Sequence, residues 1–197
     1  MPAMLRRPFL LLPLLAGGLD VRAQGVVVEG VRFDERIRLF GTELLLNGTG
    51  VRAVAWFKGY VAALYVPARA RTAAELVAQS GPRRLRLAML QNAPAAEFVK
   101  AFEKGVNRNA TEAQQAALRE RMGQFSRHVA ELLQVQRGDL VDLDFEPTRG
   151  TVLIVNGKLR GEPVPGADFF AALLRAFVGD RPYDKKLRDG LLGLAPA

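Results

Sequence analysis

The stretch from Leu44 to Pro67, LLLNGTGVRAVAWFKGYVAALYVP, constrains the fold more than any other part of the chain. It is mostly apolar and rich in Val, Phe, Trp and Tyr, residue types that favour a pleated, half-buried surface. Asn47-Gly48 is a hairpin-turn signal, so the pattern predicts a strand, a turn and then one long strand that Pro67 ends. Both faces of that long strand are largely apolar, which is typical of a central strand covered on each side.

Among the polar side chains of this stretch, Arg52, Lys58 and Tyr60 are the candidates for contact with a ligand. A cation or a phenol hydroxyl inside a buried strand needs hydrogen-bond partners, and the oxygens of a ligand could supply them. The alternative interpretation is an arginine that reaches solvent, a surface lysine and a tyrosine at the edge of the core. The residues alone leave both interpretations open.

The rest of the chain alternates between strand and helix patterns. Strands are predicted at 26–33, 37–40, 83–90 and 139–145, and two more in a hairpin with Asn156-Gly157 at its turn. Helices are predicted after Thr72, at 94–106, from Thr111 to about Gln134, at 168–178 and at 184–192. Period-two alternation places Arg84, Arg86, Asp142 and Asp144 on faces that we expect to be solvated. Without a repeat or linker, residues 24–197 are predicted to form one α+β domain, a mainly antiparallel sheet with helices against it.

Residues 1–23 have the pattern of an export signal. Arg6 and Arg7 supply the positive start, an apolar segment follows, and Val21-Arg22-Ala23 resembles a cleavage site. The apolar segment is too short to span a bilayer, and no later run approaches membrane length. The sequence therefore predicts an exported chain, periplasmic if the cell is Gram-negative, with no transmembrane segment after cleavage; a short N-terminal anchor is the alternative.

Composition excludes several kinds of chemistry. The chain has no cysteine and a single histidine, His128, so thiol nucleophiles, thiolate metal sites and histidine clusters are ruled out. The formal net charge is +8, but the basic residues are dispersed along the chain, which argues against nucleic-acid binding. The acidic group from Asp139 to Glu146 could hold a hard cation, but a solvated strand face is the favoured interpretation. We therefore predict no metal and no cofactor.

Two segments resemble the chalcone isomerase superfamily, in its bacterial chalcone isomerase-like branch. NGTGVRAVAWFKGYVAALYVP is similar to the early strand pair of that family, and NGKLRGEPVPGADFFAALLRAFVGDRPYDKKLRDGLLG is similar to its end. The order of elements between them also agrees, so the likeness covers about residues 26–193. It implies an open-faced β-sandwich: a large antiparallel sheet, helices packed on one side, and a ligand cleft between them.

The resemblance also implies site residues. The family's cleft arginine matches Arg52, and a second cleft position, Tyr in fatty-acid-binding relatives, matches Tyr60. The polar residues that plant isomerases use fall near Ala95, Phe102 and Ala176, so chalcone isomerase activity is not expected. Eight residues of straight strand span ~26 Å, so Arg52 and Tyr60 meet one ligand group only if the strand folds back, for which Gly59 is the candidate position.

The leading hypothesis is an exported, non-catalytic binder of a fatty acid or similar amphipathic carboxylate, with the headgroup held by Arg52 and Tyr60. Arginine offers a bidentate fork, the phenol adds a donor, and apolar walls bury the tail. One alternative is an isomerase or lyase that uses Arg52 as an electrophile. Another is an interaction module with a filled cleft, in which the helix from Thr111 to Gln134 contacts a protein partner. An acidic neighbour for Arg52 without a cavity beside it would exclude the binder.

Overall fold

A computed structural model describes residues 25–54 and 57–195, and the predicted export signal at 1–23 lies outside these residues. The elements in chain order are β1 (Gly25–Val28), β2 (Val31–Asp34), β3 (Arg36–Leu39), β4 (Thr42–Val54), β5 (Phe57–Val66), α1 (Ala73–Ala78), β6 (Arg83–Met89), β7 (Ala93–Pro94), α2 (Ala95–Asn109), α3 (Glu112–Ala130), β8 (Gln134–Val135), β9 (Leu140–Glu146), β10 (Gly150–Val155), β11 (Lys158–Val164), α4 (Ala167–Val178) and α5 (Lys185–Leu191). No helix in the described part is long and apolar enough to cross a membrane.

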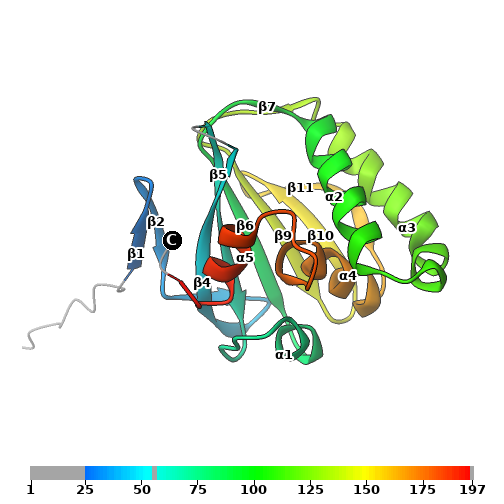
Figure 1. Ribbon diagram of the computed structural model, residues 1–197, viewed down its shortest axis with the longest axis horizontal. Coiled ribbons are helices and arrows are strands. Elements are labelled where there is room, and N and C mark those ends of the chain that lie inside the picture. Colours follow the sequence, from blue (N-terminus) through cyan, green and yellow to red (C-terminus); the bar gives the residue numbers. More distant parts are fainter. Residues whose placement is uncertain (1–24, 55–56, 196–197) are drawn as a thin grey trace, which may run out of the picture.

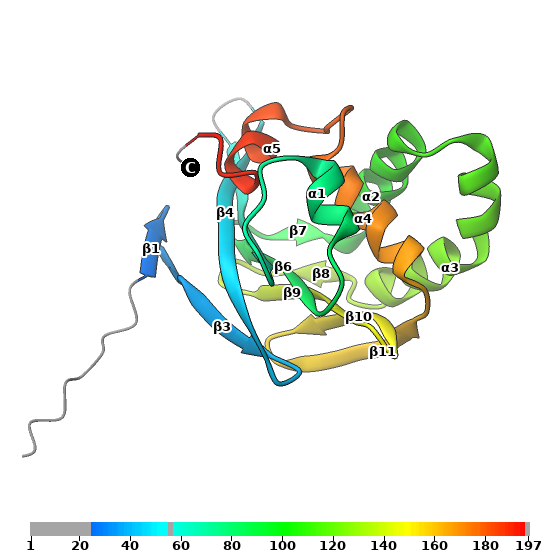
Figure 2. The same ribbon diagram turned by 90° about the horizontal axis from the view of Figure 1, so that it is seen from below.

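In the part of the chain that the structure describes, seven strands form one antiparallel sheet in the order β11-β10-β9-β6-β5-β4-β3. The sheet curls around the helices: α4 lies against it, α2 and α3 lie outside α4, and α1 and α5 close the two remaining sides (Figures 1 and 2). The β1–β2 hairpin projects from the other side of β4. This arrangement confirms the predicted α+β class, with a large antiparallel sheet and helices packed on one face.

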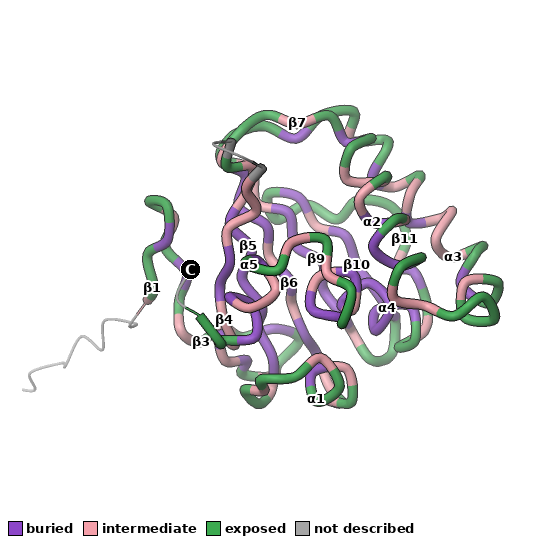
Figure 3. Tube along the Cα trace, in the orientation of Figure 1, coloured by how far each residue is buried: buried purple, intermediate pink, exposed green. Residues whose placement is uncertain are grey.

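Alternation along the strands divides the buried side chains between the two faces of the sheet. The larger core lies under the helices, where Leu64, Leu85 and Leu143 of the sheet are buried with Phe170 of α4. A smaller cluster on the opposite face contains Tyr65 and is covered by the β1–β2 hairpin. Purple segments in Figure 3 follow the sheet and α4, whereas the hairpin and the outer turns of α3 are largely exposed.

Local sequence signals placed most elements correctly. Thr72 and Thr111 cap α1 and α3 with the expected reciprocal hydrogen bonds. Asn156 and Gly157, at φ of 51° and 75°, form the predicted turn between β10 and β11. The long helix, however, ends at Ala130 and not near Gln134, which belongs to β8.

The position of the first hairpin was predicted wrongly. Asn47-Gly48 lies inside β4, at a register shift where the strand bulges, and the chain instead reverses between Val54 and Phe57. The Asn47 side chain is used for long-range contacts: its Nδ2 donates to Leu191 O at 2.7 Å, and its Oδ1 accepts from Ala70 N at 2.8 Å. The predicted single long strand is therefore two paired strands.

The expectation of a solvated acidic face was also wrong. Arg84 donates two hydrogen bonds to Asp144, at 2.7 and 2.6 Å, and Arg86 donates two to Asp142, at 2.7 and 2.8 Å. Asp142 is 4% exposed and Asp144 is fully buried. Because β6 pairs with β9, these residues form a charged ladder across the sheet, and the carboxylates that a cation site would need are bound by arginines.

Removal of one member of this ladder should be costly. Arg84→Leu leaves the buried Asp144 carboxylate without its main partner, so we expect a loss of about 3 kcal/mol of unfolding free energy, and Arg84→Leu/Asp144→Leu should recover most of it. Urea unfolding of both variants measures this. If the unfolding free energy of Arg84→Leu lies within about 1 kcal/mol of the wild-type value, the pair contributes no more than a surface ion pair.

Close contact between α5 and β4 fixes one end of the helical layer. Gly48 and Gly50 occupy the β4 face beneath α5, and a Cβ at Gly50 would lie 2.6 Å from Leu187 O. A Cβ at Gly48 would overlap Gly190 O, and one at Gly190 would overlap Thr49 O. Backbone therefore packs directly on backbone, which only glycine permits at these positions.

Gly50→Ala should separate α5 from β4 and destabilise the fold by about 2 to 3 kcal/mol, since the added methyl meets backbone atoms that cannot rotate away. Gly123→Ala in α3 is the matched control: its Cβ would meet only the Arg127 side chain at 3.6 Å. The unfolding free energy of Gly123→Ala should rise by about 0.5 to 1 kcal/mol, because alanine has the higher helix propensity. Thermal and urea unfolding compare the two, and equal effects would contradict the proposed contact.

Candidate functional site

Arg52 and Tyr60 are directly opposite each other in the β4–β5 ladder. Side chains of such cross-strand partners have Cβ atoms ~5 Å apart, so the reversal between Val54 and Phe57 removes the distance that a straight strand would impose. Gly59, the candidate position for the fold-back, lies in β5 just beyond the reversal. The sequence-predicted pair is therefore brought together, by a different turn from the one expected.

A cavity of about 440 Å³ opens beside this pair, between the sheet and the helices. Its walls are almost entirely apolar and come from the strands β4 to β10 and from all helices except α1. Phe98, Phe102 and Phe125 contribute aromatic surface. The polar lining residues are Arg52, Tyr60, Asn92, Glu97, Tyr183 and Asp184. This volume is within the range of small-molecule sites in proteins.

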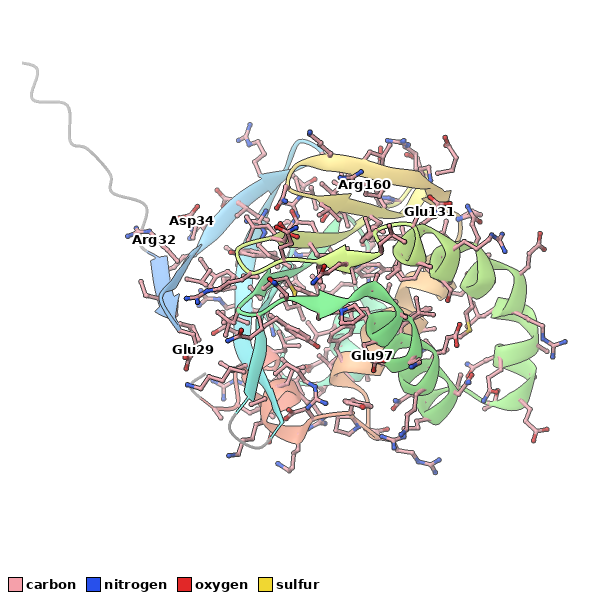
Figure 4. All side chains as sticks on the ribbon, turned by 90° about the horizontal axis from the view of Figure 1, so that it is seen from above. Glu29, Arg32, Asp34, Glu97, Glu131 and Arg160 are labelled. Carbon is pink, nitrogen blue, oxygen red and sulfur yellow. The ribbon has the colours of Figure 1, made fainter. Side chains whose placement is uncertain are left out.

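Two of the polar lining groups are already engaged by the protein. Asn92 Oδ1 accepts a hydrogen bond from Arg137 N at 2.8 Å. Glu97, labelled on α2 in Figure 4, pairs with Lys100 at 2.9 Å. Four further polar lining residues come from the β4–β5 ladder and from the segment that leads into α5, and they contact one another in part: Arg52, Tyr60, Tyr183 and Asp184.

Arg52 is held from two sides. Its Nη1 donates to Asp184 Oδ2 at 2.9 Å and to Ala53 O at 3.1 Å, and its guanidinium lies 4.5 Å from the centre of the Tyr183 ring. The side chain is only 19% exposed, so it does not extend into solvent. Asp184 is itself fixed, because its Oδ1 accepts from Leu187 N as the N-cap of α5.

Part of Arg52 is left unused by these contacts. A guanidinium has five N–H donors, and no acceptor among the described residues is bonded to Nε or Nη2. Arg52 therefore has an acidic neighbour, Asp184, which partly neutralises its charge. It also lies beside the cavity and keeps donors without a partner in the described part of the chain. An acidic neighbour of Arg52 without a cavity beside it would have excluded the binder, and here the cavity is present.

Tyr60 provides a second donor at the same end of the cavity. Burial raises the pKa of its phenol far above the ordinary value, although nearby Arg52 opposes the shift, so the group stays protonated at neutral pH. Its hydroxyl makes no hydrogen bond within the described part of the chain, and its ring packs 6.1 Å from that of Phe98. A hydroxyl without a protein acceptor in the wall of a cavity is available to a ligand.

Lys58 and His128 do not join this site. Lys58 is exposed and pairs with Glu29 at 2.8 Å, at the turn of the β1–β2 hairpin, where Figure 4 labels Glu29. His128 is half-buried on α3 against Gly161 and does not line the cavity. The sequence analysis missed Tyr183 and Asp184. Asp184 could have been found as the capping residue that opens the last helix, but its pairing with Arg52 depends on the tertiary fold.

A curled antiparallel sheet and its covering helices, with an apolar cavity between them, define a class of α+β proteins. The sequence model of the chalcone isomerase-like family matches residues 25–193. The chain belongs to this family, as the resemblance of its two motifs predicted. Comparison with curated proteins gave no similar sequence.

The fold is shared with solved structures. The crystal structure of an Arabidopsis thaliana fatty-acid binding protein is similar to this chain with a TM-score of 0.63 and 17% sequence identity. The likeness covers 86% of this chain and 96% of the plant chain. At this identity the comparison establishes the architecture, which confirms the predicted fold.

Tyr60→Phe should leave the folding stability within about 0.5 kcal/mol of the wild type, because the hydroxyl that it removes has no protein partner to lose. Urea unfolding without added ligand measures the effect. A loss above about 1.5 kcal/mol would mean that the hydroxyl is part of the structural hydrogen-bond network and is not available to a ligand.

Proposed function

We propose that the protein is an exported, non-catalytic binder of an amphipathic carboxylate such as a fatty acid, with the headgroup at Arg52 and Tyr60. The observation that carries the proposal is an apolar cavity lined by Arg52 and Tyr60, which keep hydrogen-bond donors without a partner among the described residues. Export rests on the sequence pattern of residues 1–23 alone. The fatty-acid binding protein with the same fold supports the choice of ligand class.

The arrangement suits both parts of such a ligand. Nε and Nη2 of Arg52 present a planar fork to a carboxylate, and Tyr60 adds a third donor from the facing strand. The tail would lie among the apolar walls, where each buried methylene contributes ~0.8 kcal/mol. Asp184 reduces the net charge at the headgroup, so the tail is expected to supply most of the affinity.

Three cavity positions argue against isomerase chemistry. Ala95, Phe102 and Ala176, where the family resemblance places the polar groups of plant isomerases, all line the cavity and carry no hydrogen-bonding side chain. Tyr60 is held protonated and is a poor base. The site can therefore bind an anion, but the three positions that hold polar groups in plant isomerases contribute none here.

The protein, purified without added lipid and examined by native mass spectrometry, should carry fatty acid. Arg52→Met should reduce the bound fraction about tenfold, because a charge-assisted pair to the carboxylate is lost. Ala101→Trp should also empty the protein by filling the cavity from α2 while leaving Arg52 and Tyr60 in place.

Arg119→Met is the control, since Arg119 lies on the exposed surface of α3 away from the cavity lining. It removes the same charge and should retain the wild-type load. Wild-type protein that neither carries nor takes up fatty acid, or Arg52→Met protein loaded equally well, would contradict the proposal.

A further inference from the structure

Three cations surround one aromatic ring at the mouth of the cavity. Tyr183 lines the cavity and is 41% exposed, so it lies between the interior and solvent. Arg52 lies 4.5 Å from the centre of its ring, Arg108 5.7 Å and Lys104 5.9 Å. We call Arg52, Lys104 and Arg108 the cationic rim.

The rim continues the cavity wall. Glu97 and Ala101 of α2 line the cavity, and Lys104 and Arg108 follow at the three- and four-residue steps that keep side chains on one face of a helix. A ligand that leaves the cavity past Tyr183 would therefore meet Lys104 and Arg108 next. Both side chains are exposed.

Among the described residues, protein carboxylates neutralise only one of the three cations of the rim. Asp184 is the acidic group in contact with it, and its two oxygens are already used by Arg52 and by the backbone N–H of Leu187. Lys104 and Arg108 form no ion pair with any described residue. Arg108 is in the last turn of α2, where the helix dipole favours a cation. The dipole does not account for Lys104, more than a turn earlier, or for the convergence of all three charges on one ring.

Lys104 and Arg108 have no counter-ion among the described residues, and like charges repel one another, so an anion with several oxygens would relieve that repulsion. A carboxylate carries one charge and is satisfied by Arg52 and Tyr60 alone. A phosphate group carries between one and two charges near pH 7 and presents three acceptor oxygens. It is also the group for which arginine and lysine are the usual partners.

We propose that the ligand of this site is an acyl or alkyl chain that bears a phosphate group, with the chain in the cavity and the phosphate on the cationic rim. The proposal rests on the proposed function, in which the chain fills the cavity and an acidic headgroup lies at Arg52 and Tyr60, and it changes that headgroup from a carboxylate to a phosphate. The phosphate could be attached directly to the chain or, as in a coenzyme A thioester, at a distance from it. Both share the chemistry that the rim recognises.

Titration calorimetry with ligands of one chain length tests the proposal. Dodecyl phosphate and dodecanoyl-coenzyme A are compared with dodecanoate on the delipidated wild-type protein. At least one phosphate-bearing ligand should bind about five- to tenfold more tightly than dodecanoate, and the preference should shrink as salt is raised, because the rim is solvent-exposed. Which of the two binds better distinguishes a direct phosphate from a distant one.

Lys104→Met/Arg108→Met should abolish this preference while leaving dodecanoate affinity within about twofold. Arg119→Met/Lys158→Met is the matched control, because it removes the same two charges from exposed positions on α3 and β11 and should keep the preference. Dodecanoate binding without any phosphate preference, or equal loss in the control, would overturn this inference and leave the proposed function intact. Failure of all three ligands to bind would overturn both.

Discussion

The direct contact between α5 and β4 is the constraint on which the site depends. Gly48 and Gly50 provide a strand face without side chains, so the backbone of α5 lies on the sheet itself. That contact sets the start of α5 beside Arg52, two residues beyond Gly50 on the same face, and Asp184 then both caps the helix and binds the guanidinium. The Gly-x-Gly-x-Arg pattern is therefore a structural unit: two positions for packing and one for the charge.

The polar groups compared on the two faces of the sheet differ in how many of their hydrogen bonds the protein supplies. On the face opposite the helices, Arg84 and Asp144 bind each other in a bidentate pair, which satisfies both charges. On the helix face, Arg52 has only part of its donor set occupied and Tyr60 has no acceptor in the described chain. The donors left without a partner beside the cavity are the ones that the proposed function assigns to the ligand.

Signals carried by neighbouring residues predicted much of this fold from sequence. Helix caps such as Thr72 and the turn at Asn156-Gly157 are local, and strand alternation identified β6 and β9.

Non-local facts could not be predicted. No turn signal in the sequence separates β4 from β5, so their antiparallel pairing was missed. The register that pairs Arg84 with Asp144 is set by the whole sheet, as is the burial of Arg83 between Phe145 and Phe170. Arg52 and Tyr60 were selected as a pair, but their partners Tyr183 and Asp184 lie over a hundred residues away.

The central claim is that the free edge of Arg52 receives an acidic headgroup while the tail occupies the cavity. A crystal structure of the protein with a fatty acid brominated at its methyl end tests it most directly, because anomalous scattering locates the bromine independently of the rest of the ligand. The account predicts a carboxylate within hydrogen-bonding distance of Arg52 and Tyr60 and bromine among the phenylalanines of α2 and α3. Bromine on the outer surface, or a carboxylate directed away from Arg52, would contradict it.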